Sequence, residues 1–389
     1  MSDLRSQIRL LQAASLTSSF DRFVVGPLLL TIAAAFGVGL TQTAAVASAY
    51  FLTYGLSQPL WGLCSDHFGR VRTLRAALTG AAVLGTVSAF APSLELLVLA
   101  RAGTGACIAA AVPSALVYIG DVVPFDRRQA VLTDLNAATA IGITAAIGLG
   151  GVLAAGVSWR LGFLLPALAA GVLAVILRRL PEPPQALGRR TGPGAALRST
   201  WGRRVLLLAL VEGAALLGLL TYLAPVVESR GASPTEAGAL VALYGVGLLV
   251  ASRVVKRVAG LVPPERLVVM GAAGLALAYG GVALTTAPVV VALAALLVGA
   301  GWASMHSTMQ AWATEVVPEG RAGMVSLFAA ALFVGAGLAT SALAPLAGDQ
   351  RWGALFSVGV VLAVVFGTAA GVGLHRSARQ ARLPEPPYA

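Results

Sequence analysis

The chain has 389 residues, of which 58% are hydrophobic and only 11% are charged, and its formal net charge is +11. Soluble domains carry about 25% charged residues, so this composition excludes an ordinary soluble protein and indicates one that crosses a lipid bilayer. The positive charge does not indicate nucleic-acid binding, because the basic residues lie in short loops between apolar runs rather than on one face of a soluble domain.

Apolar segments follow one another along the chain, and each is long enough to cross a bilayer as a helix, which takes about 20 residues. A helix satisfies its own backbone hydrogen bonds inside the hydrocarbon layer, so the pattern predicts an all-α integral membrane protein with about 12 transmembrane helices. The predicted spans are 10–36, 42–63, 73–92, 94–120, 129–156, 160–180, 204–227, 235–256, 266–286, 288–316, 321–347 and 352–374.

The basic residues gather in every second loop, which indicates the orientation of the spans. One set of loops holds most of the arginines and the single lysine, Lys256, whereas the opposite set holds only Arg160, Arg230 and Arg351. Loops rich in Lys and Arg stay in the cytoplasm, so both termini and the central loop are predicted to be cytoplasmic. Arginine far outnumbers lysine, and Ala and Gly are abundant, which indicates a bacterium of high GC content. The predicted location is therefore the bacterial cytoplasmic (inner) membrane.

A segment rich in Pro, Gly and Arg divides the chain into two halves of six spans. It covers residues 181–203 and is predicted to be a cytoplasmic linker. The linker joins an N-terminal bundle, 1–180, to a C-terminal bundle, 204–375, and a cytoplasmic tail at 376–389 follows.

The two halves are related in sequence. The stretch from Ile119 to Arg127 (IGDVVPFDR) matches the stretch from Ala313 to Arg321 (ATEVVPEGR). Repeats of six spans in the same direction predict two bundles around an axis along the membrane normal. Such an arrangement exposes a site near the midplane to each side in turn.

The first span contains two adjacent charged residues, Asp21 and Arg22, near its middle. Charged residues within a bilayer are costly and are functional candidates by default. Arg101 in the fourth span is a further candidate, because the equivalent position in the second half is Ala295. We therefore predict proton coupling for Asp21 and Arg101 and substrate binding for Arg22. Two alternatives stay open: a structural cluster of the three that never changes protonation, and an Arg101 that only joins two helices.

Glu212 lies in the seventh span, the counterpart of the first, at nearly the same depth as Asp21. It has no basic partner in its own helix, so it is a candidate for carrying a proton or binding a cationic group. The alternative is a neutral, hydrogen-bonded glutamic acid between two helices.

Two stripes of polar and aromatic residues are candidates for substrate binding. Trp302, His306 and Gln310 recur every four residues in the tenth span and therefore share one face. They combine a flat ring, a side chain that titrates near physiological pH and an amide, as ligand sites do. Helix packing with a satisfied histidine is the alternative. A similar stripe in the second span consists of Tyr50, Tyr54 and Gln58.

A charged loop between the second and third spans carries the pattern G-x-x-x-D-x-x-G-R-x-R. The pattern resembles the signature loop between the second and third helices of major facilitator superfamily (MFS) transporters. His67 and Val71 depart from it, because basic residues are usual at both positions. The residues that match are Gly62, Asp66, Gly69, Arg70 and Arg72.

Two further motifs resemble the same family. Arg101 matches the intramembrane arginine of its fourth helix. Gly142, Gly150 and Gly151 in the fifth span match an exporter-associated glycine motif, in which Ala146-Ile147 replaces the usual central Gly-Pro pair. Together these resemblances cover nearly the whole chain.

The resemblance implies a secondary active transporter that works by alternating access, with a small-molecule substrate and protons as its partners in the bilayer. No metal, nucleotide or nucleophile pattern indicates an enzyme, and we expect a monomer with no cofactor and the proton gradient as its energy source. The first choice is proton-coupled efflux of a small apolar or amphipathic compound. The alternative is uptake or facilitated transport of a small polar solute, an organic anion or a sugar.

The resemblance also implies a gate at the cytoplasmic ends of the helices, where charges latch the two halves shut. We expect Asp66 to face the start of the eleventh span, near Arg321 and Gly323. The predicted gate residues are Gly62, Asp66, Gly69, Arg70, Arg72, Asp121, Arg127, Glu315 and Arg321.

Overall fold

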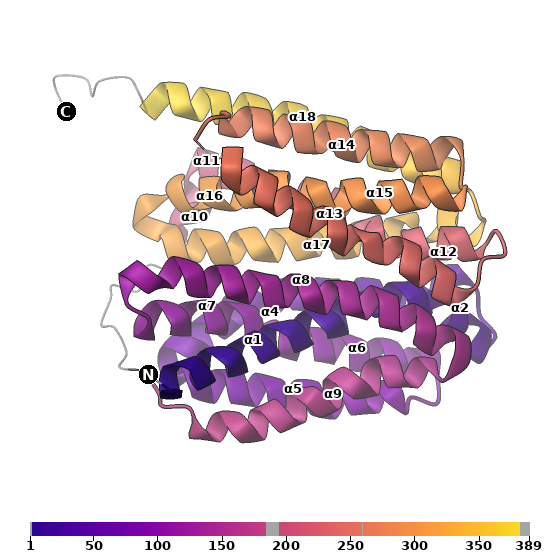
Figure 1. Cartoon of the computed structure of the whole chain (residues 1–389), viewed down its shortest axis with the longest axis horizontal. Helices are drawn as coiled ribbons and strands as arrows, with labels where there is room; N and C mark the ends of the chain where they lie inside the picture. Colours follow the sequence, from indigo (N-terminus) through magenta and orange to yellow (C-terminus); the bar gives the residue numbers. More distant parts are fainter. Residues whose placement is uncertain (1, 184–193, 259, 382–389) are drawn as a thin grey trace.

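The computed structural model describes residues 2–183, 194–258 and 260–381, and helices account for most of them (Figure 1). The N-terminal half forms six passes, two of which are broken into shorter helices. They are α1 (Ser2–Phe23) with α2 (Val25–Phe36), α4 (Ala45–Phe68) after the short α3 (Leu40–Thr43), α5 (Arg70–Ala89), α6 (Leu94–Ile108) with α7 (Ala111–Val122), α8 (Phe125–Gly156) and α9 (Trp159–Ile176).

The C-terminal half repeats this order after the short α10 (Gly194–Arg198). Two of its passes contain a π-helical turn, Ala214–Gly218 in the first and Trp302–His306 in the fourth. The passes are α11 (Thr200–Gly213) with α12 (Leu223–Glu228), α13 (Pro234–Val258), α14 (Pro264–Leu284), α15 (Pro288–Gly301) with α16 (Ser307–Glu315), α17 (Arg321–Gly348) and α18 (Trp352–Ala381).

These passes confirm the predicted all-α membrane fold. By length and hydropathy, nine helices of the described residues could each cross a bilayer, and the bent pair α1–α2 makes a tenth. α4 is 24 residues long and α5 is 20, so each is long enough to cross a bilayer. With these two, the passes match the twelve predicted spans. α4 and α5 are less apolar because they bury polar side chains, such as Gln58 and Thr73, and carry charges at one end.

Short sequence signals explain where several helices begin. The side chains of Ser93, Ser158 and Ser199 each accept a hydrogen bond from a backbone N–H in the first turn of α6, α9 and α11. Such caps satisfy donors that have no partner inside the helix. α14 and α15 instead begin with Pro264 and Pro288, a residue that suits the first turn.

The two halves form two bundles that meet along a common interface (Figure 1). Across it α8 packs on α13, α4 on α17, and α2 on α12. Gly151 of α8 and Gly238 of α13 allow a close approach, because a Cβ atom on Gly238 would lie 2.9 Å from the Cα atom of Gly151. Gly151 of the fifth span therefore brings the backbones of the two bundles into contact, whereas Gly150 faces Val24 and Pro27 of its own bundle.

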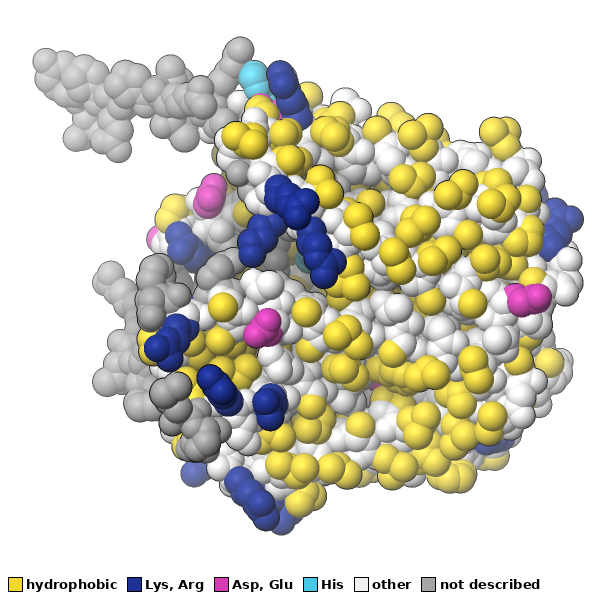
Figure 2. Space-filling view, in the orientation of Figure 1, with side chains coloured by type: hydrophobic (Ala, Val, Ile, Leu, Met, Phe, Trp, Pro, Cys, Tyr) yellow, Lys and Arg dark blue, Asp and Glu magenta, His cyan; other side chains and the backbone are white. Residues whose placement is uncertain are grey.

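The surface of the described residues separates charge from apolar side chains (Figure 2). Lys and Arg gather at one end of the molecule, which we call the Arg-rich end; it holds the start of α1, the end of α18, Arg70 and Lys256. Apolar side chains cover the flanks, and residues such as Leu99 (68% exposed) and Leu277 (72% exposed) point outward. This pattern suits a protein whose flanks face lipid.

The segment around the predicted linker contains more helix than expected. Both α10 and the start of α11 fall within residues 181–203, and α18 continues past Arg376 to Ala381. The rest of the predicted linker, 184–193, and of the predicted tail, 382–389, lies outside the described residues.

Candidate functional site

The charged pair of the first pass lies at a break between α1 and α2. The two helices are bent by 45° around Val24. Pro27 accounts for the bend, because it has no N–H and its ring clashes with the carbonyl four residues earlier, that of Phe23. Asp21 and Arg22 therefore lie in the last turn of α1, where they are 1% and 6% exposed.

Asp21 forms a buried ion pair with Arg101 of α6. The Nη1 atom of Arg101 lies 2.7 Å from Oδ1 of Asp21, and Nη2 donates to the backbone carbonyl of Asp21 at 2.8 Å. The rings of Tyr50 and Phe163 cover the guanidinium, with centroids 4.4 and 4.6 Å from its central carbon. Oδ2 of Asp21 has no hydrogen-bond partner among the described residues. The predicted contact between Asp21 and Arg101 is confirmed, and Asp21 keeps a free acceptor atom.

Arg22 points away from this pair and contacts mainly aromatic rings. It donates to Oγ of Ser19 at 3.3 Å. The rings of Phe23, Tyr54 and Phe333 lie 5.3, 4.8 and 4.8 Å from its guanidinium carbon. Cation–π contacts of this kind stabilise a cation without neutralising it. Arg22 thus is not part of a closed cluster with Asp21 and Arg101.

The tyrosines predicted in the second span connect the two arginines. Tyr50 and Tyr54 stack with their centroids 6.0 Å apart; the first ring covers Arg101 and the second covers Arg22. Gln58, one turn further along α4, is buried as well. Phe333 of α17 contacts Tyr54 at 4.4 Å, so this stripe also faces the opposite bundle.

In the C-terminal bundle the structure brings Glu212 and His306 together. Nδ1 of His306 lies 3.2 Å from Oε1 of Glu212, which is fully buried. Trp302 packs on the His306 ring at a centroid distance of 4.2 Å, and Phe328 covers that ring at 5.7 Å. Oε2 of Glu212 has no hydrogen-bond partner among the described residues. The His–Glu contact joins a residue predicted for proton coupling to one predicted for substrate binding.

Both helices of this contact leave the α-helical register at the same place. The π-helical turn Ala214–Gly218 begins two residues after Glu212, and the other, Trp302–His306, ends at the histidine. π-helical turns are rare and occur frequently at functional sites, because the extra residue re-aims side chains. Trp302 and His306 lie ring to ring, whereas Gln310 is exposed, so the predicted stripe of three is reduced to a pair.

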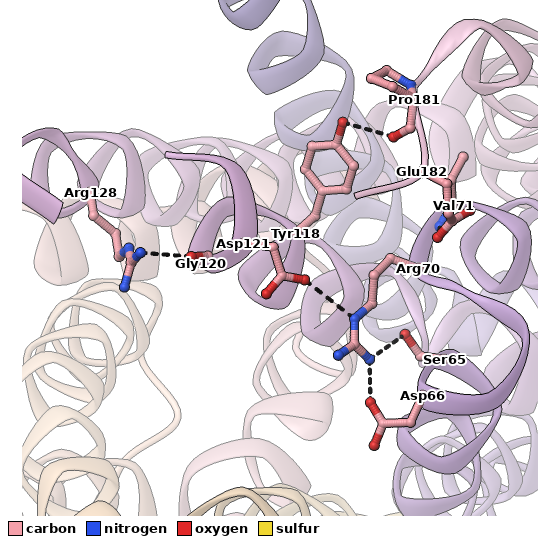
Figure 3. A network of polar contacts seen from close by, with 10 residues as sticks. All are labelled: Ser65, Asp66, Arg70, Val71, Tyr118, Gly120, Asp121, Arg128, Pro181 and Glu182. Atoms are coloured by element: carbon pink, nitrogen blue, oxygen red, sulfur yellow. Dashed lines mark hydrogen bonds and ion pairs between the residues drawn. The ribbon is translucent and has the colours of Figure 1, made fainter. Parts of the chain in front are cut away.

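A hydrogen-bonded network at the Arg-rich end contains three of the residues predicted for the gate, Asp66, Arg70 and Asp121 (Figure 3). Arg70 forms an ion pair with Asp66 and donates to Oγ of Ser65 at 3.2 Å and Oδ2 of Asp121 at 3.5 Å. It therefore joins α4, α5 and α7 within the N-terminal bundle. Arg321 donates to the Thr314 carbonyl at 2.8 Å, and the predicted position of Asp66 near Arg321 and Gly323 stays a prediction.

The expected loop from Gly62 to Arg72 is a single residue. α4 continues to Phe68 and α5 starts at Arg70, so Gly62 lies inside α4 and not in the loop. Gly69 makes the turn alone, with a φ of 101° that other residues rarely adopt. The Glu182 carboxylate lies against this glycine and accepts hydrogen bonds from the backbone N–H groups of Val71 and Arg72 at 3.0 and 3.3 Å (Figure 3).

In each half an arginine at the end of the repeated motif, or directly after it, contacts the backbone of the preceding pass. Arg321 ends the motif, whereas Arg128 follows the equivalent residue Arg127. Arg128 donates to the carbonyl of Gly120 at 2.6 Å, and Arg321 donates to the carbonyl of Thr314 at 2.8 Å. Gly120 and Thr314 are equivalent positions of the repeat. Each arginine satisfies a carbonyl at the C-terminus of the preceding pass, where a cation is favoured. Arg127 and Glu315, also predicted for the gate, are exposed at this end.

Replacing Asp66 with Asn is expected to slow transport while leaving the KM nearly unchanged. The part-exposed ion pair with Arg70 is worth about 1 kcal/mol or less, which corresponds to a three- to sixfold slower turnover. Initial transport rates in membrane vesicles measure both quantities. Glu319→Gln, which changes an exposed carboxylate at the same end, is the control. A wild-type turnover in Asp66→Asn, or a loss confined to KM, contradicts a gating role.

Sequence reasoning missed some residues that contact the site. Phe333 touches both Arg22 and Tyr54, but it is one apolar residue in an apolar helix and no pattern distinguishes it. Glu182 caps α5 from a segment that was expected to be only a linker. Tyr244 of α13 lies against Phe23, with ring centroids 6.5 Å apart.

Comparison with known proteins finds matches over most of the chain. The family model described as "Major Facilitator Superfamily" matches residues 13–340. A triacylglyceride transporter of Mycobacteroides abscessus is 31% identical over 33% of this chain and 26% of its own length. The lincomycin resistance protein of Streptomyces lincolnensis is 33% identical over 48% of this chain and 39% of its own length. The gallate transporter of Pseudomonas putida is 27% identical over 48% of this chain and 43% of its own length. The matched region thus spans less than half the length of these relatives.

Solved structures share the fold over nearly the full length. A bacterial homologue of the human lysosomal transporter Spinster superimposes with a TM-score of 0.72 at 18% identity, over 99% of this chain and all of that chain. The xylose transporter XylE from E. coli superimposes with a TM-score of 0.76 at 15% identity, over 93% and 95%. At these identities the likeness concerns the fold alone.

Proposed function

Because the chain belongs to the Major Facilitator Superfamily, a family of transporters rather than enzymes, we propose that it exports a small amphipathic compound in exchange for protons. One observation carries this proposal. Each bundle buries one carboxylate, Asp21 or Glu212, against a basic side chain from another helix of that bundle. Each carboxylate also keeps one oxygen without a partner, to which a proton can be added.

Protonation of Asp21 acts on the interface between the bundles. A proton on the carboxylate removes its charge and weakens the ion pair with Arg101, while Arg101 still donates to the backbone carbonyl of Asp21. α1 leads directly into α2, which packs on α12 of the other bundle. A change at Asp21 therefore biases the position of an interface helix, as coupling between proton binding and conformation requires.

Glu212 and His306 form the second site of the proposal. The two π-helical turns place this contact at points where the passes are irregular. Rearranging such a turn costs less than breaking a regular helix, so the contact is suited to a pass that moves during transport.

The Arg-rich end is the cytoplasmic end in this proposal, in accord with the positive-inside rule. The close interbundle contacts of Gly151 with Gly238 and of Thr41 with Ala344 lie toward the opposite end. They support a state that is closed to the outside. The protein would then act as a monomer in a bacterial cytoplasmic membrane, with the proton gradient as its energy source and no cofactor.

The proposal of export of an amphipathic compound is supported by one of the relatives and by the apolar residues around Arg22. The lincomycin resistance protein is named for resistance, which supports export, and the apolar, aromatic surroundings of Arg22 suit an amphipathic compound. The gallate transporter supports the alternative from the sequence, movement of an organic anion. Arg22 specifically favours an anionic group, because it is a buried cation without a carboxylate partner among the described residues.

A toxicity panel in efflux-deficient bacteria tests this function. Cells would express wild type, Asp21→Asn, Glu212→Gln or the control Asp349→Asn, an exposed aspartate at the end of α17, all at equal level. We expect resistance to at least one compound in wild type and control and its loss in both other variants. Sensitivity of wild-type cells to every compound contradicts export, and resistance kept by both carboxylate variants contradicts coupling through these groups.

A further inference from the structure

The described residues bury two arginines and two carboxylates, but these do not pair evenly. Asp21 is neutralised by Arg101, and Glu212 contacts His306. Arg22, 6% exposed, has only the Ser19 hydroxyl and three aromatic rings as partners. A buried cation without a counter-charge is costly, so a site that keeps one is suited to receive an anion from elsewhere.

Arg22 lines a cavity between the two bundles. The cavity has a volume of about 20 Å³, which holds about one water molecule. Its walls come from both halves of the chain, with Gly26, Phe51 and Ile147 on one side and Thr221 and Val241 on the other. The site thus lies on the surface that opens and closes during alternating access, and a larger guest can be admitted only when the bundles separate there.

Arg22 and the residues near it include donors without a hydrogen-bond partner. Nε of Arg22 and the hydroxyl of Tyr244 are buried without a hydrogen-bond partner among the described residues. Tyr244 comes from α13 of the C-terminal bundle, packs on Phe23 and lies close enough to Arg22 to interact with it electrostatically. The hydroxyl of Tyr50, also unpartnered, lies in the same electrostatic neighbourhood. Buried donors left unpaired by the protein are the groups that a ligand satisfies.

We propose that Arg22 binds the anionic group of the transported compound, with the Tyr244 hydroxyl as a donor from the opposite bundle, and that the substrate is therefore a small amphipathic organic anion. The guanidinium offers several N–H donors for a carboxylate. The rings of Phe23, Tyr54 and Phe333 contact the apolar part of the molecule. This inference rests on the proposed transport function and specifies its substrate class.

The anion held between Arg22 and Tyr244 also explains how a substrate affects conformation. Its two donors belong to different bundles, so the anion gains both contacts only when the bundles are close together at this point. A ligand shifts an equilibrium by its differential affinity for the two states. Substrate binding therefore favours the state in which the bundles enclose it.

Equilibrium binding to the purified protein in detergent tests the proposal without any gradient. The probes are matched in shape and differ in charge: benzoate, benzamide and benzylamine, then octanoate and octanamide, with chloride as an inorganic anion. Saturable stabilisation against thermal unfolding gives each Kd. We expect the two carboxylates to bind wild type more tightly than their neutral and cationic counterparts. We expect chloride not to compete with them.

The variants then assign the anion contact to Arg22. Arg22→Gln is expected to raise the Kd of the carboxylates by about ten- to hundredfold, because a hydrogen bond to a charged group is lost. Arg22→Lys, which keeps the charge, and Tyr244→Phe, which removes the second donor, are expected to lose less. Arg253→Gln, which changes an exposed arginine of α13, is the control and should bind as wild type does.

Three results would overturn the proposal: neutral probes that bind wild type as well as the carboxylates do, an unchanged Kd in Arg22→Gln and Arg22→Lys, or full competition by chloride. If the protein exchanges protons for a neutral compound instead of an anion, the proposed anion site is wrong but the proposed export function stands. Conversely, anion binding that depends on Arg22 stands even if no proton coupling is found.

Discussion

Asp21→Asn is expected to reduce gradient-driven transport to the level of empty liposomes while leaving substrate exchange in place. In the wild type, Nη1 of Arg101 lies 2.7 Å from Oδ1 of Asp21. An asparagine keeps an oxygen for this contact, but it cannot bind or release a proton. Transport that needs the carboxylate to change protonation then stops. Exchange of labelled for unlabelled substrate needs no net proton movement and continues.

The same variant also leaves Arg101 buried without a formal counter-charge. Removing one partner of a buried ion pair costs about 3–5 kcal/mol, so the melting temperature is expected to fall. Retained exchange separates this loss of stability from a loss of coupling, because an unfolded protein exchanges nothing. Uphill transport by Asp21→Asn, at any rate close to that of wild type, would exclude Asp21 as the coupling group.

Gly151→Leu is expected to abolish transport by holding the two bundles apart at the end opposite the Arg-rich end. A side chain at Gly151 would overlap the carbonyl of Pro234 and would place its Cβ 3.0 Å from the Cα of Gly238. Both obstacles are backbone atoms of α13 and cannot move aside as a flexible side chain does. The closed arrangement is therefore lost and the population shifts toward the state open to the outside.

Accessibility of Thr221 reports this shift. Thr221 is 6% exposed and lines the interbundle cavity, so a cysteine there, with Cys64 and Cys107 replaced by Ser, reacts with a membrane-impermeant maleimide only when that end opens. We expect fast labelling from outside in Gly151→Leu and slow labelling in the Gly156→Leu control. Gly156 lies on the same helix with nothing within 4 Å of its Cβ position. Equal, slow labelling in both would show that contact at Gly151 is not needed for closure.

Hydropathy and loop charge were sufficient to predict the fold. Each predicted span corresponds to one pass, because a bilayer requires about 20 apolar residues whatever the neighbouring helices are. Breaks inside the passes were harder to predict. Pro27 indicates the bend at Val24, but the π-helical turns at Ala214 and Trp302 have no comparable sequence signal.

The sequence identified the residues of the candidate site better than it identified which of them contact one another. Asp21 and Arg101 were expected to meet, since two opposite charges buried in one bundle have few other partners. Glu212 and His306 were assigned separate roles, because nothing in the sequence of α11 points to α15 and α16, and the π-helical turn alters the face on which His306 lies.

The loop between α4 and α5 shows how a motif and its geometry can differ. The pattern located Asp66, Gly69 and Arg70 correctly as one network, but it did not indicate which glycine makes the turn. That depends on the φ of Gly69 and on the Glu182 carboxylate, which comes from more than a hundred residues further along the chain.

Proton movement in liposomes loaded with a pH-sensitive dye tests the central claim most directly. Purified wild-type protein would be reconstituted without a pH gradient and given a compound that the toxicity panel identifies. We expect a gradient of this compound to drive protons in the opposite direction. The internal pH should change only when the compound is present, and Asp21→Asn should abolish the change. Movement of the compound by wild type at constant internal pH would contradict this claim.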